Sequence, residues 1–289
     1  MRQYSETLTA ATNSRGVLDI DTVKGCYFGM KTYPDGGCYK LCYAAKIAAR
    51  YKIDFSKSII RKDINHSRIE KAVIRHKLPW FRVGTMGDPS YSWNYTIKVC
   101  EWLSRFKTPV IITKHWVPMS NDHISALKKC GAIVNTSTSP LDSRAEIDYR
   151  VNTFKSLKKL GVKSVLRVVS VKFGADSKYD EKKHIQDRLF LNTPIIDNPL
   201  RIMINDNRVV SGQIVVQKHK GAVGGSTVSI SNKATYLGKC GLCPDQCGVE
   251  FNKLWVGGYK MTKGEDDSKM VPCKYDPKAM NQIEMFTDT

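Results

Sequence analysis

Short apolar segments and amphipathic segments alternate along most of the chain. The apolar segments predict strands at residues 17–23, 80–85, 110–113, 132–138, 162–171 and 200–205. The amphipathic segments predict helices at residues 43–51, 93–106, 122–130, 144–160 and 178–191. Ser120 and Asn121 mark the start of one helix, and Gly161 marks the end of another. Strands that alternate with helices of this length predict a parallel sheet with crossover helices.

Six strand–helix units are fewer than the eight of a closed barrel. We therefore predict an α/β fold, a partial (β/α)6 TIM-type barrel over residues 1–206, with a doubly wound open sheet as the alternative. Either architecture places a ligand at the C-terminal ends of the strands. Residues 207–289 are predicted to form a small cysteine-rich C-terminal extension, with short strands at residues 209–216 and 226–230.

Composition indicates a globular protein without a membrane segment. The chain has 289 residues, of which 42% are hydrophobic, enough for a sizeable core. No segment approaches the roughly 20 apolar residues that cross a bilayer. The polar stretch at residues 1–14 lacks the apolar run of a signal peptide. We therefore expect a cytoplasmic protein with reduced thiols and no membrane contact.

The charge balance points to a polyanionic partner. Lys plus Arg number 46 against 27 for Asp plus Glu, a formal net charge of +19. A field of this size favours DNA or RNA, although a basic soluble protein without such a partner is the alternative. Basic residues recur at 57–62, 68–77 and 155–163, and the chain also has aromatic residues in its predicted loops. Such residues together hold phosphates and stack bases.

Three of the nine cysteines, Cys26, Cys38 and Cys42, lie on a glycine-rich segment between the first predicted strand and the first predicted helix. Disulfides are a poor explanation in a reducing compartment, and metal binding or catalysis is a better one. Three thiolates on one segment suit a [4Fe–4S] cluster that keeps one iron free of protein ligands. The spacing also allows catalytic zinc or no metal at all.

Four further cysteines lie near the C-terminus. Cys240, Cys243 and Cys247 form a C-x2-C-x3-C pattern, and Cys273 follows. This pattern suits structural zinc or a second [4Fe–4S] cluster, with an unligated group of reduced thiols as the alternative. The two remaining cysteines, at positions 100 and 130, lie in periodic apolar segments and are expected to be small buried hydrophobic side chains.

The sequence resembles the radical S-adenosylmethionine (SAM) enzymes, and among them the branch of spore photoproduct lyase and related phage-type uncharacterised proteins. In that family the third cluster cysteine is often followed by Tyr-Ala, as in Cys42-Tyr43-Ala44. The resemblance covers roughly residues 15–205 and includes similar motifs at residues 83–89, 109–114, 135–144 and 161–168. The cysteine spacing differs, because this chain has C-x11-C-x3-C where the family commonly has C-x3-C-x2-C.

The resemblance implies cofactors and roles for particular residues. The cluster on Cys26, Cys38 and Cys42 would bind SAM and cleave it reductively to methionine and a 5′-deoxyadenosyl radical. An electron donor such as flavodoxin or ferredoxin would reduce the cluster. Residues implied to contact SAM or the cluster are Tyr43, Gly84, Thr85, Met86, Thr136, Ser137 and Arg167.

These roles differ from residue to residue. The carbonyls of residues 84–86 would accept from the SAM amino group, and Thr136 or Ser137 would bond the ribose or the methionine end. Arg167, a charge within an apolar strand, would pair with the SAM carboxylate or with a core acid. Asp88 and Lys114 are candidates for substrate contact.

Three functions follow from these observations. The first is a radical SAM enzyme acting on nucleic acid, in repair or base modification. The second is a radical SAM enzyme modifying a peptide or small metabolite. The third is a zinc-dependent nucleic-acid-binding protein without radical chemistry.

Overall fold

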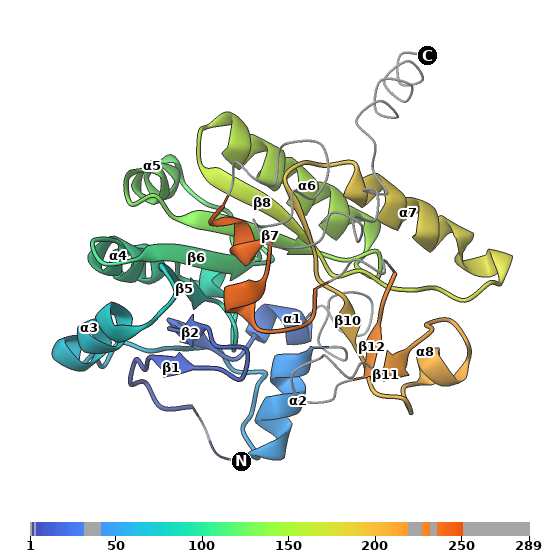
Figure 1. The fold of residues 1–289 in the computed structure, drawn as a ribbon, viewed down its shortest axis with the longest axis horizontal. Coiled ribbons are helices and arrows are strands. Elements are labelled where there is room, and N and C mark those ends of the chain that lie inside the picture. Colours follow the sequence, from blue (N-terminus) through green and yellow to red (C-terminus); the bar gives the residue numbers. More distant parts are fainter. Residues whose placement is uncertain (1, 3, 32–41, 219–226, 232–235, 251–289) are drawn as a thin grey trace.

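A seven-stranded sheet forms the centre of the molecule, in the order β1-β2-β5-β6-β7-β8-β9 (Figure 1). The computed structural model describes residues 2, 4–31, 42–218, 227–231 and 236–250. Strands β2 to β9 of this sheet run parallel to their neighbours, and β1 is antiparallel to β2. The strands are β1 (Ala11–Thr12), β2 (Leu18–Asp19), β5 (Trp80–Val83), β6 (Thr108–Thr113), β7 (Ile133–Thr138), β8 (Lys163–Val168) and β9 (Ile195–Asp197).

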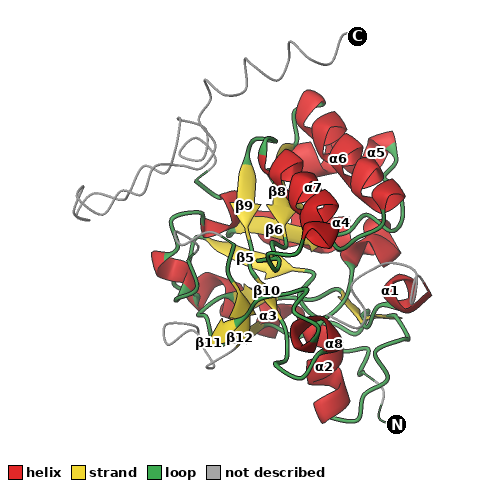
Figure 2. Cartoon of the chain, turned by 90° about the vertical axis from the view of Figure 1, so that its right-hand side faces the viewer, coloured by secondary structure: helices red, strands yellow, loops and turns green. Residues whose placement is uncertain are grey.

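Helices alternate with these strands, which confirms the predicted α/β class. Among them α4 packs on β6, and α6 packs on β7 and β8. Figure 2 shows α4 to α7 grouped on one side of the strands. The helices are α1 (Tyr27–Lys31), α2 (Tyr43–Arg50), α3 (His66–Arg75), α4 (Trp93–Ser104), α5 (Asn121–Lys129), α6 (Arg144–Lys159) and α7 (Asp180–Phe190). None of the helices in the described residues is long and apolar enough to span a membrane.

Side-chain hydrogen bonds fix the ends of two predicted helices. The Ser120 hydroxyl accepts from the backbone N–H of His123 at the start of α5. Ser143 and Glu146 form a reciprocal capping box at the start of α6, in which the Glu146 carboxylate accepts the Ser143 N–H at 2.8 Å. Gly161 follows α6 with φ +83°, the left-handed geometry that ends many helices. These signals confirm the predicted helix boundaries.

The two faces of the sheet carry different layers, because strand side chains alternate in direction. Phe81, Ile111 and Val134 join the largest core cluster, which also takes in residues of α4 and α5. The opposite face packs against Cys240 and Cys247 through the early strand residues Val17, Trp80, Val110, Ile133, Val165 and Ile196. Two residues further along the same face stand Asp19, Arg82, Ile112, Asn135, Arg167 and Asn198. A mainly polar layer therefore lies nearer the strand C-termini than the apolar layer.

The prediction that residues 200–205 form the sixth parallel strand of the main sheet is wrong. The sixth parallel strand is β9, and β10 (Leu200–Arg201) belongs to a separate sheet in the order β10-β12-β11. Its other strands are β11 (Gln217–Lys218) and β12 (Thr227–Ser229). Pro199 separates β9 from β10, and proline lacks the N–H that would extend a ladder.

Two further strand predictions need correction. The predicted strand at residues 209–216 is wrong. At its start α8 (Asn207–Val210) forms, because the Asp206 side chain caps the N–H of Arg208 at 3.1 Å, and of the remaining residues only Ile214 forms an isolated bridge. The first predicted strand, residues 17–23, is divided. Only β2 joins the main sheet, and β3 (Val23–Lys24) pairs antiparallel with β4 (Ile59–Ile60).

The predicted C-terminal extension is only partly described. Residues 240–248, orange in Figure 1, lie against the face of the sheet that the helices leave uncovered. Asn135 of β7 donates from Nδ2 to the carbonyl of Cys247 at 2.9 Å. This part of the extension therefore closes one face of the main sheet, and the boundary at residue 206 stays a prediction.

Candidate functional site

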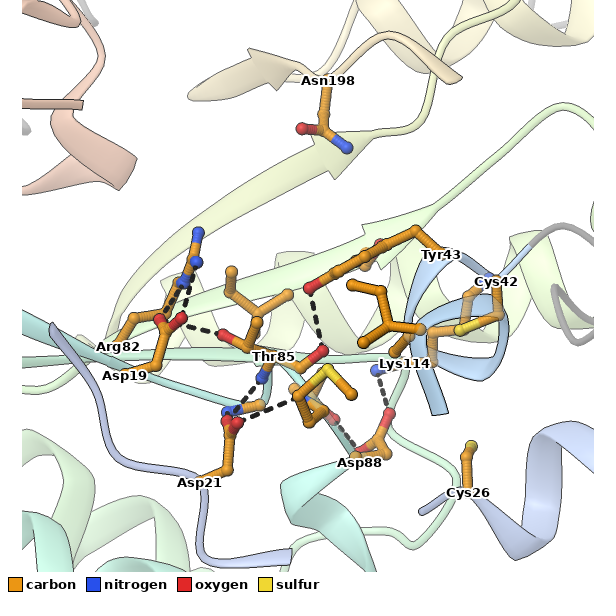
Figure 3. Close-up of a pocket in the computed structure, with 18 of the residues that line it drawn as sticks. Asp19, Asp21, Cys26, Cys42, Tyr43, Arg82, Thr85, Asp88, Lys114 and Asn198 are labelled. Atoms are coloured by element: carbon orange, nitrogen blue, oxygen red, sulfur yellow. Dashed lines mark hydrogen bonds and ion pairs between the residues drawn. The ribbon is translucent and has the colours of Figure 1, made fainter. Parts of the chain in front are cut away.

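A cavity of about 520 Å³ lies at the C-terminal ends of the parallel strands (Figure 3). This volume is in the range of small-molecule and cofactor sites. Residues that directly follow β5, β6, β8 and β9 line it. Of the residues predicted to bind a cofactor or the N-terminal metal, the cavity lining includes Cys26, Cys42, Tyr43, Gly84, Thr85, Met86, Ser137 and Arg167.

Cys26 and Cys42 reach this cavity from different elements. Figure 3 shows both sulfurs at the same end of the cavity. Cys42 stands at the N-terminus of α2, and Cys26 directly precedes α1. Both pack with Phe55 and Met86 in one apolar cluster. Cys38 lies outside the described residues, so the three-cysteine ligand set stays a prediction.

Gly25 sets the approach of Cys26 to the end of β5. Gly25 donates its N–H to the carbonyl of Met86 at 2.9 Å and forms an isolated parallel bridge with Gly87. At φ +84°, a Cβ at Gly25 would stand 1.8 Å from the carbonyl oxygen of Lys57. Only glycine fits this position, because both the backbone angle and the space exclude a side chain.

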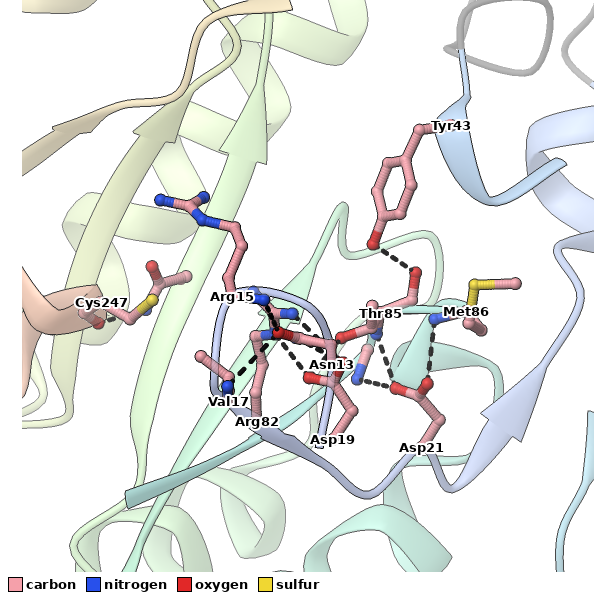
Figure 4. A network of polar contacts seen from close by, with 12 residues as sticks. Asn13, Arg15, Val17, Asp19, Asp21, Tyr43, Arg82, Thr85, Met86 and Cys247 are labelled. Atoms are coloured by element: carbon pink, nitrogen blue, oxygen red, sulfur yellow. Dashed lines mark hydrogen bonds and ion pairs between the residues drawn. The ribbon is translucent and has the colours of Figure 1, made fainter. Parts of the chain in front are cut away.

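The carboxylate of Asp21 organises residues 84–86, which we call the 84–86 loop. It accepts the backbone N–H groups of Gly84 at 2.9 Å, Thr85 at 2.6 Å and Met86 at 3.1 Å (Figure 4). Lys24 adds an ion pair to the same carboxylate at 3.1 Å. The three amides are thereby satisfied, and the loop is held in one conformation.

The carbonyl groups of this loop face other partners. The Tyr43 hydroxyl donates to the carbonyl of Thr85 at 2.8 Å, and Met86 accepts from Gly25. Each carbonyl oxygen has a second lone pair for a ligand donor. Gly84 has φ +96°, and a Cβ there would stand 2.1 Å from the carbonyl oxygen of Ile112. The loop therefore needs glycine at its first position.

An ion pair on the cavity floor joins the first two parallel strands. Arg82 of β5 donates to both carboxylate oxygens of Asp19 in β2, at 2.8 and 3.3 Å. Asn13 and the Thr85 hydroxyl also donate to Asp19, at 2.8 and 3.1 Å (Figure 4). Asp19 and Asp21 were absent from the predicted site. Their alternate spacing at the end of the first predicted strand was the signal that could have indicated them.

Arg167 lies in the cavity wall with neutral partners. Its guanidinium donates to the side-chain oxygens of Asn198 at 3.0 Å and Asn135 at 3.4 Å, and to the sulfur of Cys247 at 3.8 Å. Only 7% of Arg167 is exposed. No acid within the described ranges forms an ion pair with it. The predicted pairing with a core acid is therefore not seen among these residues.

Lys114 and Asp88 belong to a buried polar network. Lys114 Nζ contacts both carboxylate oxygens of Asp142, at 2.8 and 2.9 Å, and Arg150 donates to Asp142 at 2.6 Å. Burial opposes ionisation of Asp142, but Lys114 and Arg150 outweigh it and lower the pKa of its carboxyl. Asp88 accepts from the Thr113 hydroxyl and from the backbone N–H of Lys114, both at 2.8 Å. Both predicted substrate contacts thus have structural partners, and Asp142 and Arg150 were not predicted from the sequence.

Thr136 and Ser137 lie on opposite faces of β7. Ser137 lines the cavity. Thr136 is buried on the other face, where its hydroxyl is 2.9 Å from Nε2 of His115. Of these two candidates for a SAM contact, only Ser137 therefore reaches the cavity.

The C-terminal cysteines form no metal site among the described residues. Cys240 and Cys247 are 4% and 8% exposed and pack among apolar strand residues. Burial raises the pKa of Cys243 to about 12. The part of the chain that the structure describes has no group of three His, Cys, Asp or Glu side chains placed to hold a metal, and Cys273 lies outside it. The second metal site stays a prediction.

The remaining cysteines and two tryptophans belong to the core. Cys100 is fully buried, as predicted, whereas Cys130 is only half-buried at the edge of the same cluster. Trp80 and Trp93 are buried as well, and Trp116 lines the cavity. Arg150 lies over the Trp116 ring, 4.8 Å from its centroid.

Comparisons with known proteins do not assign the chain to a family. No protein-family model, no curated protein and no solved structure matches it. The resemblance to radical SAM enzymes therefore rests on the sequence motifs and stays a prediction.

Proposed function

We propose that the protein is a radical SAM enzyme, built on a partial (β/α)6 barrel, with a [4Fe–4S] cluster on Cys26, Cys38 and Cys42. One observation carries the proposal. Cys26 and Cys42 line the same cavity as the 84–86 loop, at the C-terminal ends of the parallel strands. Ligands of parallel α/β folds bind at this edge.

The residues present fit the cofactors. Cysteine thiolates are the usual ligands of iron–sulfur clusters, and the two described cysteines lie at one end of the cavity. When bound, the cluster supplies the electron that cleaves SAM to methionine and a 5′-deoxyadenosyl radical, after reduction by a donor such as flavodoxin or ferredoxin.

The chain's own residues bind and orient SAM in this proposal. Carbonyls of the 84–86 loop accept from its amino group, and Tyr43 fixes the Thr85 carbonyl. Arg167 binds an anionic group through its buried guanidinium, and Ser137 bonds the ribose or the methionine end. The apolar side chains around Cys26 and Cys42 exclude water from the reacting end.

The substrate we propose is nucleic acid. The formal net charge of +19 supports this, and so does the exposed face of α3. Arg68, Lys71 and Arg75 are exposed there at helical spacing and line one shallow depression. Binding of DNA or RNA whose affinity falls steeply with salt supports this choice over a peptide or small metabolite.

Two further assignments belong to the same proposal. We place the protein in the cytoplasm, where its cysteines stay reduced and an iron–sulfur cluster is assembled. We assign zinc or a second [4Fe–4S] cluster to the C-terminal cysteines Cys240, Cys243, Cys247 and Cys273.

Reductive cleavage of SAM tests the proposed activity. Protein purified without oxygen is mixed with SAM and dithionite, and 5′-deoxyadenosine is quantified. We expect product from the wild-type chain and from Cys130→Ala, because Cys130 lies at the edge of the core cluster away from the cavity lining. We expect none from Cys42→Ala. A zinc-containing protein that forms no 5′-deoxyadenosine refutes the proposal and supports the zinc-dependent alternative.

A further inference from the structure

Three arginines line the cavity without an acidic partner among the described residues. Arg15 lies between β1 and β2, Arg167 on β8, and Arg201 on β10. Arg15 and Arg167 therefore come from opposite sides of the main sheet, near β1 and on the neighbour of β9, and Arg201 comes from the separate sheet that contains β10. The ion pairs found in the described part of the chain include none of the three.

The acids that line the cavity have other partners. Asp19 binds Arg82, and Asp21 binds Lys24 together with the amides of the 84–86 loop. The two other acids, Asp88 and Asp142, are engaged by the Lys114 backbone and side chain respectively. No carboxylate of the described lining therefore neutralises the three arginines.

Three guanidiniums without a carboxylate partner are electrostatically unfavourable unless an anion binds between them. The guanidinium of Arg167 is buried among neutral side chains, and a buried charge without a counter-ion is costly. Burial and then the neighbouring charge of Arg15 lower the pKa of Arg201. The positive charges of Arg15, Arg82 and Arg167 each lower the pKa of the Cys240 thiol, which indicates that these three guanidiniums lie in the same part of the molecule. A bound anion would offset the repulsion between the guanidinium groups of Arg15, Arg167 and Arg201.

We propose that Arg15, Arg167 and Arg201 bind a phosphate group of the substrate. Planar guanidiniums recognise phosphate oxygens in pairs, and three positive charges match a phosphate monoester dianion, or neighbouring phosphodiesters of a nucleic acid, better than a single carboxylate. SAM carries one carboxylate, so one arginine suffices for it and the others remain for the substrate. The inference rests on the proposed function in one respect, that the ligand of this cavity is the enzyme's substrate.

Equilibrium binding to the full chain tests the proposal. The probes are inorganic phosphate, uridine 5′-monophosphate and uridine, measured without SAM or reductant. We expect the nucleotide to bind about tenfold or more tightly than the nucleoside, and Arg201→Gln to weaken nucleotide binding about tenfold. Arg188→Gln is the matched control, because Arg188 is exposed on α7 outside the cavity lining.

A short oligonucleotide without terminal phosphates identifies the source of the phosphate. If the oligonucleotide binds more tightly than the nucleotide, nucleic acid is the source of the phosphate. If the nucleotide binds more tightly, the source is a small phosphorylated compound. In either case the proposal is supported when Arg201→Gln weakens the binding. Equal affinities for nucleotide and nucleoside overturn it. So does wild-type nucleotide affinity in both Arg15→Gln and Arg201→Gln, since Arg15 and Arg201 are half-exposed and tolerate glutamine.

Failure of this inference is distinguishable from failure of the proposed function. If the chain holds no iron but binds phosphate, the radical SAM assignment is contradicted and the arginine site is still supported. SAM cleavage by a chain without phosphate affinity does the reverse. If Arg201→Gln weakens SAM binding but not nucleotide binding, the arginines serve the SAM carboxylate and the inference is wrong.

Discussion

The Tyr43 hydroxyl donates a 2.8 Å hydrogen bond to the carbonyl oxygen of Thr85. This bond joins the first residue of α2, directly after Cys42, to the loop that ends β5. Figure 3 shows the bond within the cavity, between the cysteine end and the Asp19–Arg82 pair. The proposed cluster ligand and the proposed SAM-binding carbonyls are thereby linked by one side chain.

Removing this hydroxyl should weaken SAM binding while leaving the cluster in place. Tyr43→Phe keeps the ring and loses one hydrogen bond, which is worth about 0.5–1.5 kcal/mol. We expect the Kd for SAM to rise about three- to tenfold, as measured by equilibrium dialysis without oxygen. Unchanged iron content is the internal control. Unchanged SAM affinity would show that the orientation of the Thr85 carbonyl is irrelevant.

Asp21→Asn should destabilise the whole fold. Asp21 is 3% exposed and accepts three backbone amides, whereas an asparagine side chain turns two N–H donors toward that region. We expect the free energy of unfolding in urea to fall by about 2–4 kcal/mol. Asp148→Asn is the control, because Asp148 forms an exposed pair with Arg144 worth at most about 0.5 kcal/mol. Equal losses in the two variants would argue against the role of Asp21.

Gly84→Ala and Gly131→Ala make a matched pair. Both glycines have positive φ, but a Cβ at Gly84 would overlap the carbonyl oxygen of Ile112, whereas at Gly131 it would meet nothing within 4 Å. We expect Gly131→Ala to cost about 1–2 kcal/mol through the backbone angle alone. Gly84→Ala should cost on the order of 4 kcal/mol or more and abolish SAM binding. Similar unfolding midpoints for the two variants would be inconsistent with the packing at the end of β5.

His115 should make stability fall as the solution is acidified. Burial, and then the charge of Arg150, lower the pKa of His115 from 6.5 to about 3. Between about pH 6 and pH 4 the unfolded chain therefore binds close to one proton more at this imidazole than the folded chain does. The loss is roughly 1.4 kcal/mol per pH unit between pH 6 and pH 4.

Replacing the imidazole should remove this part of the pH dependence. His115→Asn should flatten the curve of unfolding free energy against pH by that amount, and asparagine tolerates the φ of +53° at this position. His184→Asn, an exposed site on α7, should keep the wild-type slope. An unchanged slope in His115→Asn would mean that the buried ring is already protonated in the folded protein.

The sequence predicted the main sheet well because its strands are apolar and separated by capped amphipathic helices. β6, β7 and β8 fall within or close to the predicted segments. β9 was missed because it has three residues and is followed closely by Asn198 and Pro199, which resemble a loop. A strand this short is defined by its pairing with β8, and a pattern along one segment does not contain that information.

Site residues could be predicted where the residue type itself indicates the chemistry. They could not be predicted where the role depends on which face of a strand a residue occupies or on how the strands pair. Thr136 and Ser137 were equivalent in the sequence because β7 is buried on both faces, which hides the alternation that would separate them. Asp142 and Arg150 were missed because their partner Lys114 is 28 and 36 residues away along the chain. Such contacts arise only when β6 and β7 pair.

The metal content of protein prepared without oxygen tests the central claim most directly. Iron, acid-labile sulfide and zinc are measured per chain for the wild type, Cys42→Ala and the control Cys130→Ala. We predict that Cys42→Ala loses about four iron and about four sulfide relative to the wild type, while Cys130→Ala loses none. Zinc as the only metal of the wild-type chain, or full iron in both Cys26→Ala and Cys42→Ala, would contradict it.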